Sequence, residues 1–306
     1  MQQAFDFKLE CECLFDVLKD FNDHDFKQTT QFKIWTIEDI LGHLHLFNVA
    51  ADITLECGQK FDAFFANITK ELNSGKSLLQ AQYPWLDGLS GRALYETWIE
   101  GSYQTAKKYS KADPKMRVKW AGPDMSARSS ITARQMETWA HGHEIFDVLG
   151  VERTETDRIK NIVFLGVNTF GWSYVVNKKV VPENMPYLLL TAPSGDLWEF
   201  GDKNNEEIIS GEAVSFAQVV TQTRSFYDVN LKVKGQVASE WMNIAQCFAG
   251  SLEKPPLAGT RIIQRLTAIK KYCSFKSDLN VAKGRERFLN MKTLLSLIKS
   301  SGIYEK

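Results

Sequence analysis

The sequence predicts an α + (α+β) protein: an up-and-down bundle of four long helices, a small α+β domain and a basic helical tail. Up to about residue 150, apolar residues recur at helical spacing, connections are short and strand signals are missing. After Gly150, short apolar runs separated by turn residues alternate with helical segments. From Arg261 onward, eleven Lys and Arg stand against three Asp and Glu. We therefore place the domains at 1–152, 153–260 and 261–306.

The bundle helices are recognised by their start and stop signals. Thr36 is a good N-cap, and Asp39 lies three residues later, in the position of a capping box. Gly150 is expected to close the last helix, because glycine is favoured just past a helix end. The segment 61–72 is either a separate helix or a continuation of the helix before it. The expected helices cover about 5–21, 37 to at least 47, 61–72, 92–111, and 126 or 129 to 149, with a loop at 114–123.

The second domain is expected to contain a β-hairpin, because two strand-type runs flank the turn Pro193-Ser-Gly-Asp196. Further strand and helix patterns follow the hairpin, and a helical segment precedes it. The expected order is a helix at 157–176, strands at 187–191, 197–200 and 207–210, a helix at 211–222, a strand at 228–233 and a helix at 239–248.

Composition is that of an ordinary globular protein, with 44% hydrophobic and 24% charged residues. The net charge is zero, but the segment from Arg261 carries +8 and the preceding residues carry −8. The five cysteines lack metal-type CxxC spacing, and their odd number argues against a disulfide framework. The N-terminus does not read as a signal peptide, and no apolar run approaches the roughly 20 residues of a membrane span. We expect a reduced, soluble, cytoplasmic protein without a membrane span.

Histidine is scarce, and four of the five histidines form two pairs. His43 and His45 lie on the second expected helix, and His141 and His143 lie on the last bundle helix. Glu137 and His141 are four residues apart, so their side chains share one helix face. A histidine from a facing helix would complete a metal site of the kind that bundles build in their cores. Taken alone, this spacing is also common in helices without metal.

The predicted ligands are His43, Glu137 and His141. Three N/O ligands leave a fourth coordination position open for water or substrate, as in catalytic zinc sites. His45 and His143 lie two residues from the ligands and therefore point about 200° away on a helix. We expect them to stay outside the site.

Three motifs resemble those of a known family. The segment 35–43, WTIEDILGH, resembles the signature of the DinB-like metal-binding superfamily, and within it the N-terminal domain of mycothiol-dependent maleylpyruvate isomerase. The segments 119–129, KWAGPDMSARS, and 133–141, ARQMETWAH, resemble a family of uncharacterised metal-binding proteins in this superfamily. The segments 165–173, 191–198 and 245–250 also match the pattern of this family, so the resemblance covers about residues 5–260. The tail lies outside it.

The resemblance implies a DinB-like four-helix bundle that holds a divalent metal, zinc or nickel, through His43, Glu137 and His141. It also implies a bacterial-type, thiol-dependent enzyme of the maleylpyruvate isomerase type. In such enzymes the metal lowers the pKa of a low-molecular-weight thiol, which then adds to an electrophilic substrate. The expected reaction is cis–trans isomerisation or S-conjugation.

Four further residues are candidates for the site. Arg134 shares a helix face with Glu137, and Arg128 lies at the helix entrance; either could bind an anionic thiol or substrate, because guanidinium pairs bidentately with carboxylates. Trp120 could line an apolar pocket. Glu144, one turn beyond His141, could accept the free ring N–H of that histidine. The alternatives are a bracing or surface role for the arginines, a core position for Trp120 and a solvated charge for Glu144.

Two other functions remain open: a metal-binding or ligand-recognition protein without catalysis, and a metal-dependent hydrolase. The expected partner is a small-molecule substrate or a thiol. The tail contains two basic amphipathic stretches, 262–272 and 285–297. Nucleic acid or an anionic membrane could bind such helices. We favour docking on the acidic body of the same or a sister subunit, which would make the protein a homo-oligomer in the second case. Deleting 261–306 should then lower solubility or the melting temperature.

Overall fold

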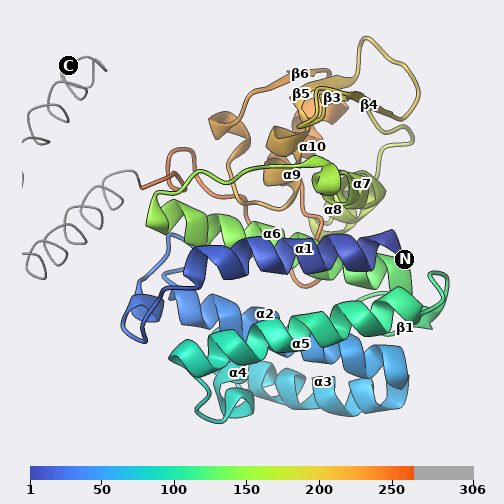
Figure 1. The fold of residues 1–306 in the computed structure, drawn as a ribbon. Helices are drawn as coiled ribbons and strands as arrows, with labels where there is room; N and C mark the ends of the chain where they lie inside the picture. The colour runs from blue at the N-terminus through green and yellow to red at the C-terminus, as the bar shows by residue number, and fades with distance from the viewer. Residues whose placement is uncertain (265–306) are drawn as a thin grey trace, which may run out of the picture. The chain divides into compact units, whose positions relative to one another are not determined.

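Four long helices form the N-terminal part of the protein, as the sequence predicts (Figure 1). The computed structural model describes residues 1–264. In the bundle, helix α1 packs against α5 and α6, and α2 packs against the same two helices. The bundle helices are α1 (Gln2–Leu18), α2 (Ile37–Glu56), α5 (Gly91–Lys111) and α6 (Ala127–Leu149).

The ends of α2 and α6 follow the sequence signals closely. The Thr36 hydroxyl accepts a hydrogen bond from the Asp39 backbone N–H at 3.2 Å, and the Asp39 carboxylate accepts one from the Thr36 N–H at 2.9 Å. This is the predicted capping box. Ser126, rather than Ser129, is the N-cap of α6, because its hydroxyl accepts from the Ser129 N–H. Gly150 ends the helix in the left-handed conformation, with φ of 65°.

Two further helices pack against α2 on its outer side. Helix α3 (Gly58–Asn73) is separate from α2, because the chain becomes extended at Cys57. Helix α4 (Leu78–Leu86) is not predicted from the sequence. Pro84 argues against a helix there, since proline lacks the N–H donor, but a capping box between Ser77 and Gln80 starts one. The other elements in this part are η1 (Asp25–Lys27), β1 (Arg117–Val118) and β2 (Met125–Ser126).

A mixed four-stranded sheet forms the core of the second part, in the order β4-β3-β5-β6. The predicted hairpin of β3 and β4 is confirmed, whereas β3 and β5 pair in parallel. Helix α9 packs on β3 and β5, and α10 packs on β6. The elements are η2 (Asp157–Ile159), α7 (Lys160–Asn168), α8 (Phe170–Val176), β3 (Tyr187–Thr191), β4 (Leu197–Phe200), β5 (Ile208–Glu212), α9 (Ala213–Val220), η3 (Phe226–Asp228), β6 (Leu231–Lys234) and α10 (Gln236–Ile244).

Helix α6 belongs to both hydrophobic cores. Ile131 and Ile145 pack into the core of the bundle, whereas Met136 and Trp139 pack into the core around the sheet. In Figure 1, α6 accordingly lies between the other bundle helices and the sheet. Residues 1–264 form one compact unit, and the boundary expected at 152/153 remains a prediction. Among residues 1–264, no helix is long and apolar enough to cross a membrane.

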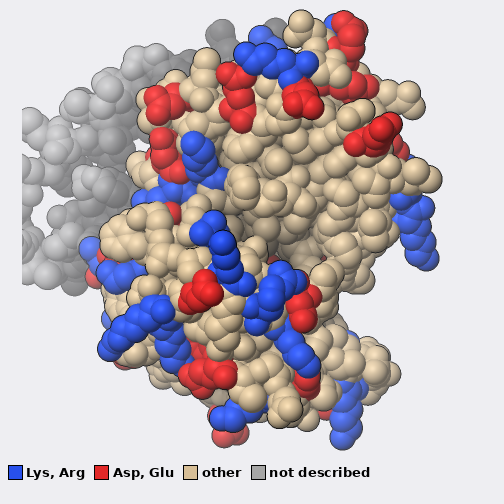
Figure 2. All heavy atoms as spheres, turned by 90° about the vertical axis from the view of Figure 1, so that its right-hand side faces the viewer, with Lys and Arg blue, Asp and Glu red and all other residues tan. Residues whose placement is uncertain are grey.

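Figure 2 shows one face of the molecule, on which acidic and basic side chains lie interspersed around a broad uncharged area. Of the predicted tail, residues 261–264 are described, and they run without helical structure. Most of the amphipathic stretch 262–272, from residue 265 on, and all of the stretch 285–297 lie outside the described residues. Their docking on the body therefore stays a prediction.

Candidate metal centre

Helices α2 and α6 bring His43, Glu137 and His141 together. The capping box that starts α2 puts His43 about two turns into that helix, on the side packed against α6. The donor atoms of the three side chains all lie within 4.8 Å of one another. His43 Nε2 is 3.4 Å and His141 Nε2 is 3.3 Å from the same carboxylate oxygen, Glu137 Oε2. Among the described residues, this is the one cluster of His, Cys, Asp and Glu with metal-ligand spacing.

The spacing of these atoms fits a divalent cation. Zinc binds nitrogen and oxygen at about 2.0–2.2 Å, so two ligands of a tetrahedral site lie about 3.3–3.5 Å apart. The distances of 3.4 and 3.3 Å from the two histidines to Glu137 Oε2 match this edge length. Two imidazoles and one carboxylate also form the donor set of catalytic zinc sites, which keep a fourth position open. The residues present can therefore hold a divalent metal.

The electrostatics keep His43 and Glu137 in the forms that bind metal. Burial, only partly offset by the hydrogen bond to Glu137, lowers the pKa of His43 to about 4, so its imidazole is neutral at pH 7. Burial alone would raise the pKa of Glu137. Hydrogen bonds with His141 and His43 and the positive charge of Arg134 outweigh burial and hold the pKa of Glu137 well below its usual value. An ionised carboxylate and a neutral imidazole need lose no proton to bind a cation.

Aromatic rings surround the two histidines. The Phe32 ring meets His141 edge-on, with ring centres 4.9 Å apart, and the Trp35 ring lies parallel to His141 at 6.1 Å. The Phe47 ring packs on His43, with ring centres 4.8 Å apart. The side chain of Glu137 is 22% exposed, against 8% for His43. Solvent therefore reaches the centre mainly on the side of the carboxylate.

Gln82 is a site residue that sequence reasoning missed, because it lies on the unpredicted helix α4. Its amide is buried and lies 3.0 Å from His43 Nδ1, on the side of the ring away from Glu137. In the present orientation the amide nitrogen faces His43, and Gln82 Oε1 has no hydrogen-bond partner among the described residues. Rotating the amide by 180° lets this oxygen accept the Nδ1–H, which leaves the Nε2 lone pair free for a metal.

Replacing Gln82 by leucine should therefore weaken metal binding by about 10–100-fold, the usual effect of losing a hydrogen-bond partner of a histidine ligand. The shape of the side chain is nearly kept, so the fold should persist. Competition with a chromogenic chelator measures the affinity. Gln104→Leu, at an exposed position of α5, makes the same change away from the centre and is the control. Equal affinities for the two variants would contradict the role of Gln82.

Arg134 is almost completely buried, with 2% of its surface exposed. Its Nε donates to Asn48 Oδ1 at 3.2 Å, its guanidinium lies over the rings of Phe47 and Trp120, and Nη2 has no hydrogen-bond partner among the described residues. Trp120 stacks on Phe61 with ring centres 5.6 Å apart. The rings of Phe47, Trp120 and Phe61 thus form an aromatic layer that begins at His43, and the Arg134 guanidinium lies against it.

Other candidates lie elsewhere. Arg128 is exposed at the start of α6 and makes no contact with the ligands among the described residues. Glu144 does not accept a hydrogen bond from His141; its carboxylate instead pairs with Arg261 at 3.1 Å. His45 packs on Trp85, and His143 lies 3.3 Å from Glu155, so both point away from the centre.

Comparison with known proteins supports the assignment of the helical part. Residues 7–146 match the model of the mycothiol maleylpyruvate isomerase N-terminal domain. This confirms the resemblance for the bundle; the similarities beyond residue 146 remain predictions. Two uncharacterized proteins, from two strains of Mycobacterium tuberculosis, are each 42% identical over 135 residues, which are 44% of this chain and 52% of theirs. The chain thus spans about half the length of the curated relatives it matches.

Among solved structures, the chain is similar to mycothiol-dependent maleylpyruvate isomerase and to an alanine mutant of that enzyme. Both are 13% identical in sequence, and the match covers 71% of this chain and 87% of theirs. The TM-scores are 0.45 for the enzyme and 0.44 for the mutant.

Proposed function

We propose that this protein binds a divalent metal, zinc in the first place, and uses it to activate a low-molecular-weight thiol. The match of residues 7–146 to the mycothiol maleylpyruvate isomerase N-terminal domain supports this proposal. The activity would be thiol-dependent isomerisation or S-transfer. The observation that supports this best is the triad itself: two imidazoles and one carboxylate at metal-ligand spacing, with the side towards Glu137 open.

The charges of the site favour an anionic ligand. The carboxylate of Glu137 and the guanidinium of Arg134 cancel each other in a largely buried layer. A divalent cation would leave two positive charges in excess, and a thiolate or carboxylate ligand would reduce that excess. When bound, the metal supplies Lewis acidity, which lowers the pKa of a thiol in its open coordination position. Arg134 adds a permanent charge and an N–H group that lacks a partner.

Aromatic residues offer a surface for the organic part of such a ligand. An open surface depression of about 520 Å³ lies beside Trp120 and the stacked rings of Phe61 and Phe65 on α3. From Trp120 the aromatic layer continues through Phe47, 6.2 Å away, to His43. We propose that the ligand lies along this layer with its thiol at the metal.

Cobalt substitution tests the thiol. Cobalt(II) bound to the triad should develop a near-ultraviolet charge-transfer band when mycothiol, glutathione or cysteine is added, because thiolate sulfur is a soft ligand of such metals. His24→Ala, which removes an exposed histidine, should give the same band as the unchanged protein. Cobalt binding without a band for any thiol would refute thiol activation and favour the two alternatives, metal binding without catalysis or a metal-dependent hydrolase.

Arg134→Met should weaken binding of an anionic thiol by about 2–5 kcal/mol, because truncating one partner of a buried charge pair leaves the other unpaired. Methionine fills more of the space than alanine, which matters at a position this buried. Isothermal calorimetry on metal-loaded protein gives the affinity. Arg128→Met makes the same change at an exposed position of α6 and should have no effect. If both variants bind equally well, Arg134 only braces the bundle.

A further inference from the structure

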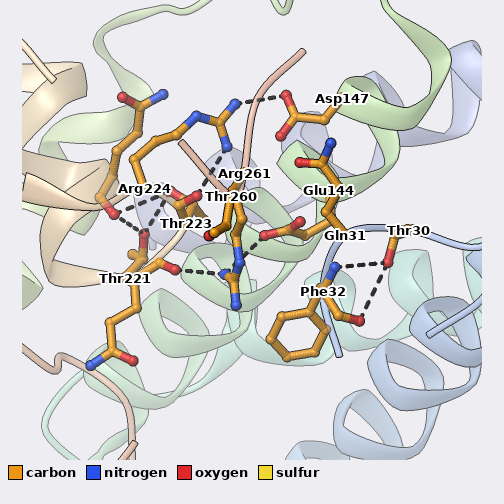
Figure 3. A network of polar contacts seen from close by, with 12 residues as sticks. Thr30, Gln31, Phe32, Glu144, Asp147, Thr221, Thr223, Arg224, Thr260 and Arg261 are labelled. Carbon is orange, nitrogen blue, oxygen red and sulfur yellow. Dashed lines mark hydrogen bonds and ion pairs between the residues drawn. The ribbon is translucent and has the colours of Figure 1, made fainter. Parts of the chain in front are cut away.

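Two buried ion pairs connect α6 to residues later in the chain, Arg224 between α9 and η3 and Arg261 after α10. Glu144 and Asp147, one turn apart on α6, are each only 1% exposed. Glu144 pairs with Arg261 at 3.1 Å, and Asp147 pairs with Arg224 at 2.6 Å (Figure 3). Glu144 lies one turn beyond His141. The ion pairs therefore anchor the later part of the chain directly beside the metal centre.

The segment 251–264, which we call the strap, lies between the second part of the protein and the loop at 30–35. The Gly259 N–H donates to both oxygens of the Asp228 carboxylate, which ties the strap to the part that carries the sheet. Three residues later, the Ile262 N–H donates to Gln31 Oε1 at 2.8 Å. Lys33 of the loop forms an ion pair with Glu253 of the strap. The loop is thus held from outside by the strap.

Arg261 is the strap residue that lies against a neighbour of the metal ligands. Besides pairing with Glu144, it donates to the Gln222 carbonyl, and its guanidinium lies 5.1 Å from the centre of the Phe32 ring. The Phe32 ring in turn meets His141 edge-on. One side chain, that of Phe32, therefore separates Arg261 from a metal ligand.

The 30–35 loop needs such support because its backbone is strained. Lys33 and Ile34 have φ of 48° and 61°, a region that side chains other than glycine avoid, and branched Ile34 most of all. Strain of this kind persists only where surrounding contacts hold it. Inside the loop, the Thr30 hydroxyl donates to the Trp35 carbonyl at 2.8 Å. Backbone hydrogen bonds of Thr30 with Trp35 and of Trp35 with Phe32 also hold the loop, and Trp35 packs in the core of the bundle. The strap adds the contacts that hold the loop from outside.

We infer that Arg261 is a positioning residue of the metal centre: through Phe32 it holds the 30–35 loop against His141, so that the strap completes the site. This inference rests on the proposed metal binding. Phe32 and Trp35 limit the access of water to His141 and fix its ring, and the apolar shell around a metal controls solvent access and ligand orientation. Loss of the Arg261 contact should therefore release the metal faster.

Zinc release from the full-length, zinc-loaded protein tests the inference. Rapid mixing with excess chromogenic chelator gives the release rate, and thermal unfolding gives the midpoint for each variant. Arg261→Gln and Phe32→Leu should each accelerate release on the order of tenfold. The double variant should release zinc no faster than the faster single variant, because both changes break one chain of contacts.

Arg224→Gln is the matched control, since it breaks the neighbouring buried ion pair without touching Phe32. It should lower the thermal midpoint and leave the release rate within about twofold of the unchanged protein. Equal acceleration by Arg224→Gln and Arg261→Gln, or no acceleration by Arg261→Gln, would overturn the role of Arg261 alone. If the unchanged protein binds no zinc, the proposed function itself is wrong, and the positioning role falls with it.

Discussion

His43→Ala and His141→Ala should each remove the metal from the purified protein, which should otherwise carry one divalent ion per chain. Each substitution deletes one of three protein ligands. The loss should exceed the roughly 10–100-fold that removal of an outer partner such as Gln82 causes. Elemental analysis of protein prepared without chelators or nickel affinity media measures the stoichiometry.

Stability offers a second measurement of the same effect. A metal that binds only the folded state stabilises it by about 2.7 kcal/mol at a concentration 100 times its Kd. Added zinc should therefore raise the melting temperature of the unchanged protein but not that of His43→Ala. The exposed His24 provides the matched control, because His24→Ala should keep both the stoichiometry and the shift. A full equivalent of metal in both ligand variants would refute the triad.

The triad could be predicted because its geometry is local. Residues four apart share a helix face in any α-helix, so the side chains of Glu137 and His141 must point the same way once α6 forms. The capping box at Thr36 likewise fixes where α2 begins and therefore which side of it carries His43. That the two helices face each other follows from the bundle, which the periodicity indicates.

The partners of the triad could not be predicted because they depend on tertiary contacts. Pro84 argues against a helix in the sequence, although α4, which carries Gln82, forms there. Glu144 has the right spacing for a hydrogen bond with His141, but Arg261, 117 residues later in the chain, takes its carboxylate. Helix α6 is buried on nearly all sides, so its apolar residues do not mark one buried face. Their spacing in the sequence therefore does not show that Arg134 lies inside the bundle. The parallel pairing of β3 and β5 joins strands that are not connected by a hairpin.

Glu10→Ala should destabilise the protein by about 3–5 kcal/mol, a large part of the 5–15 kcal/mol that usually separates folded from unfolded states. Glu10 of α1 is 1% exposed and forms an ion pair with Arg153, whose side chain is 3% exposed. Arg153 lies in the segment that joins α6 to η2, over the rings of Trp139 and Phe146. Removing Glu10 leaves this buried guanidinium with a single carboxylate, that of Glu155, at 3.1 Å.

Urea unfolding of the full-length protein measures this cost, and two further variants show where it comes from. Glu96→Ala breaks an exposed pair with Arg92 and should cost less than about 1 kcal/mol. Adding Arg153→Met to Glu10→Ala removes the guanidinium that has lost Glu10, while Glu155 keeps its contacts with His143 and Trp139. A buried ion pair replaced by apolar groups is often close to neutral. The double variant should therefore be more stable than Glu10→Ala alone. If it is less stable, the cost arises from lost packing around Arg153 and not from an uncompensated charge.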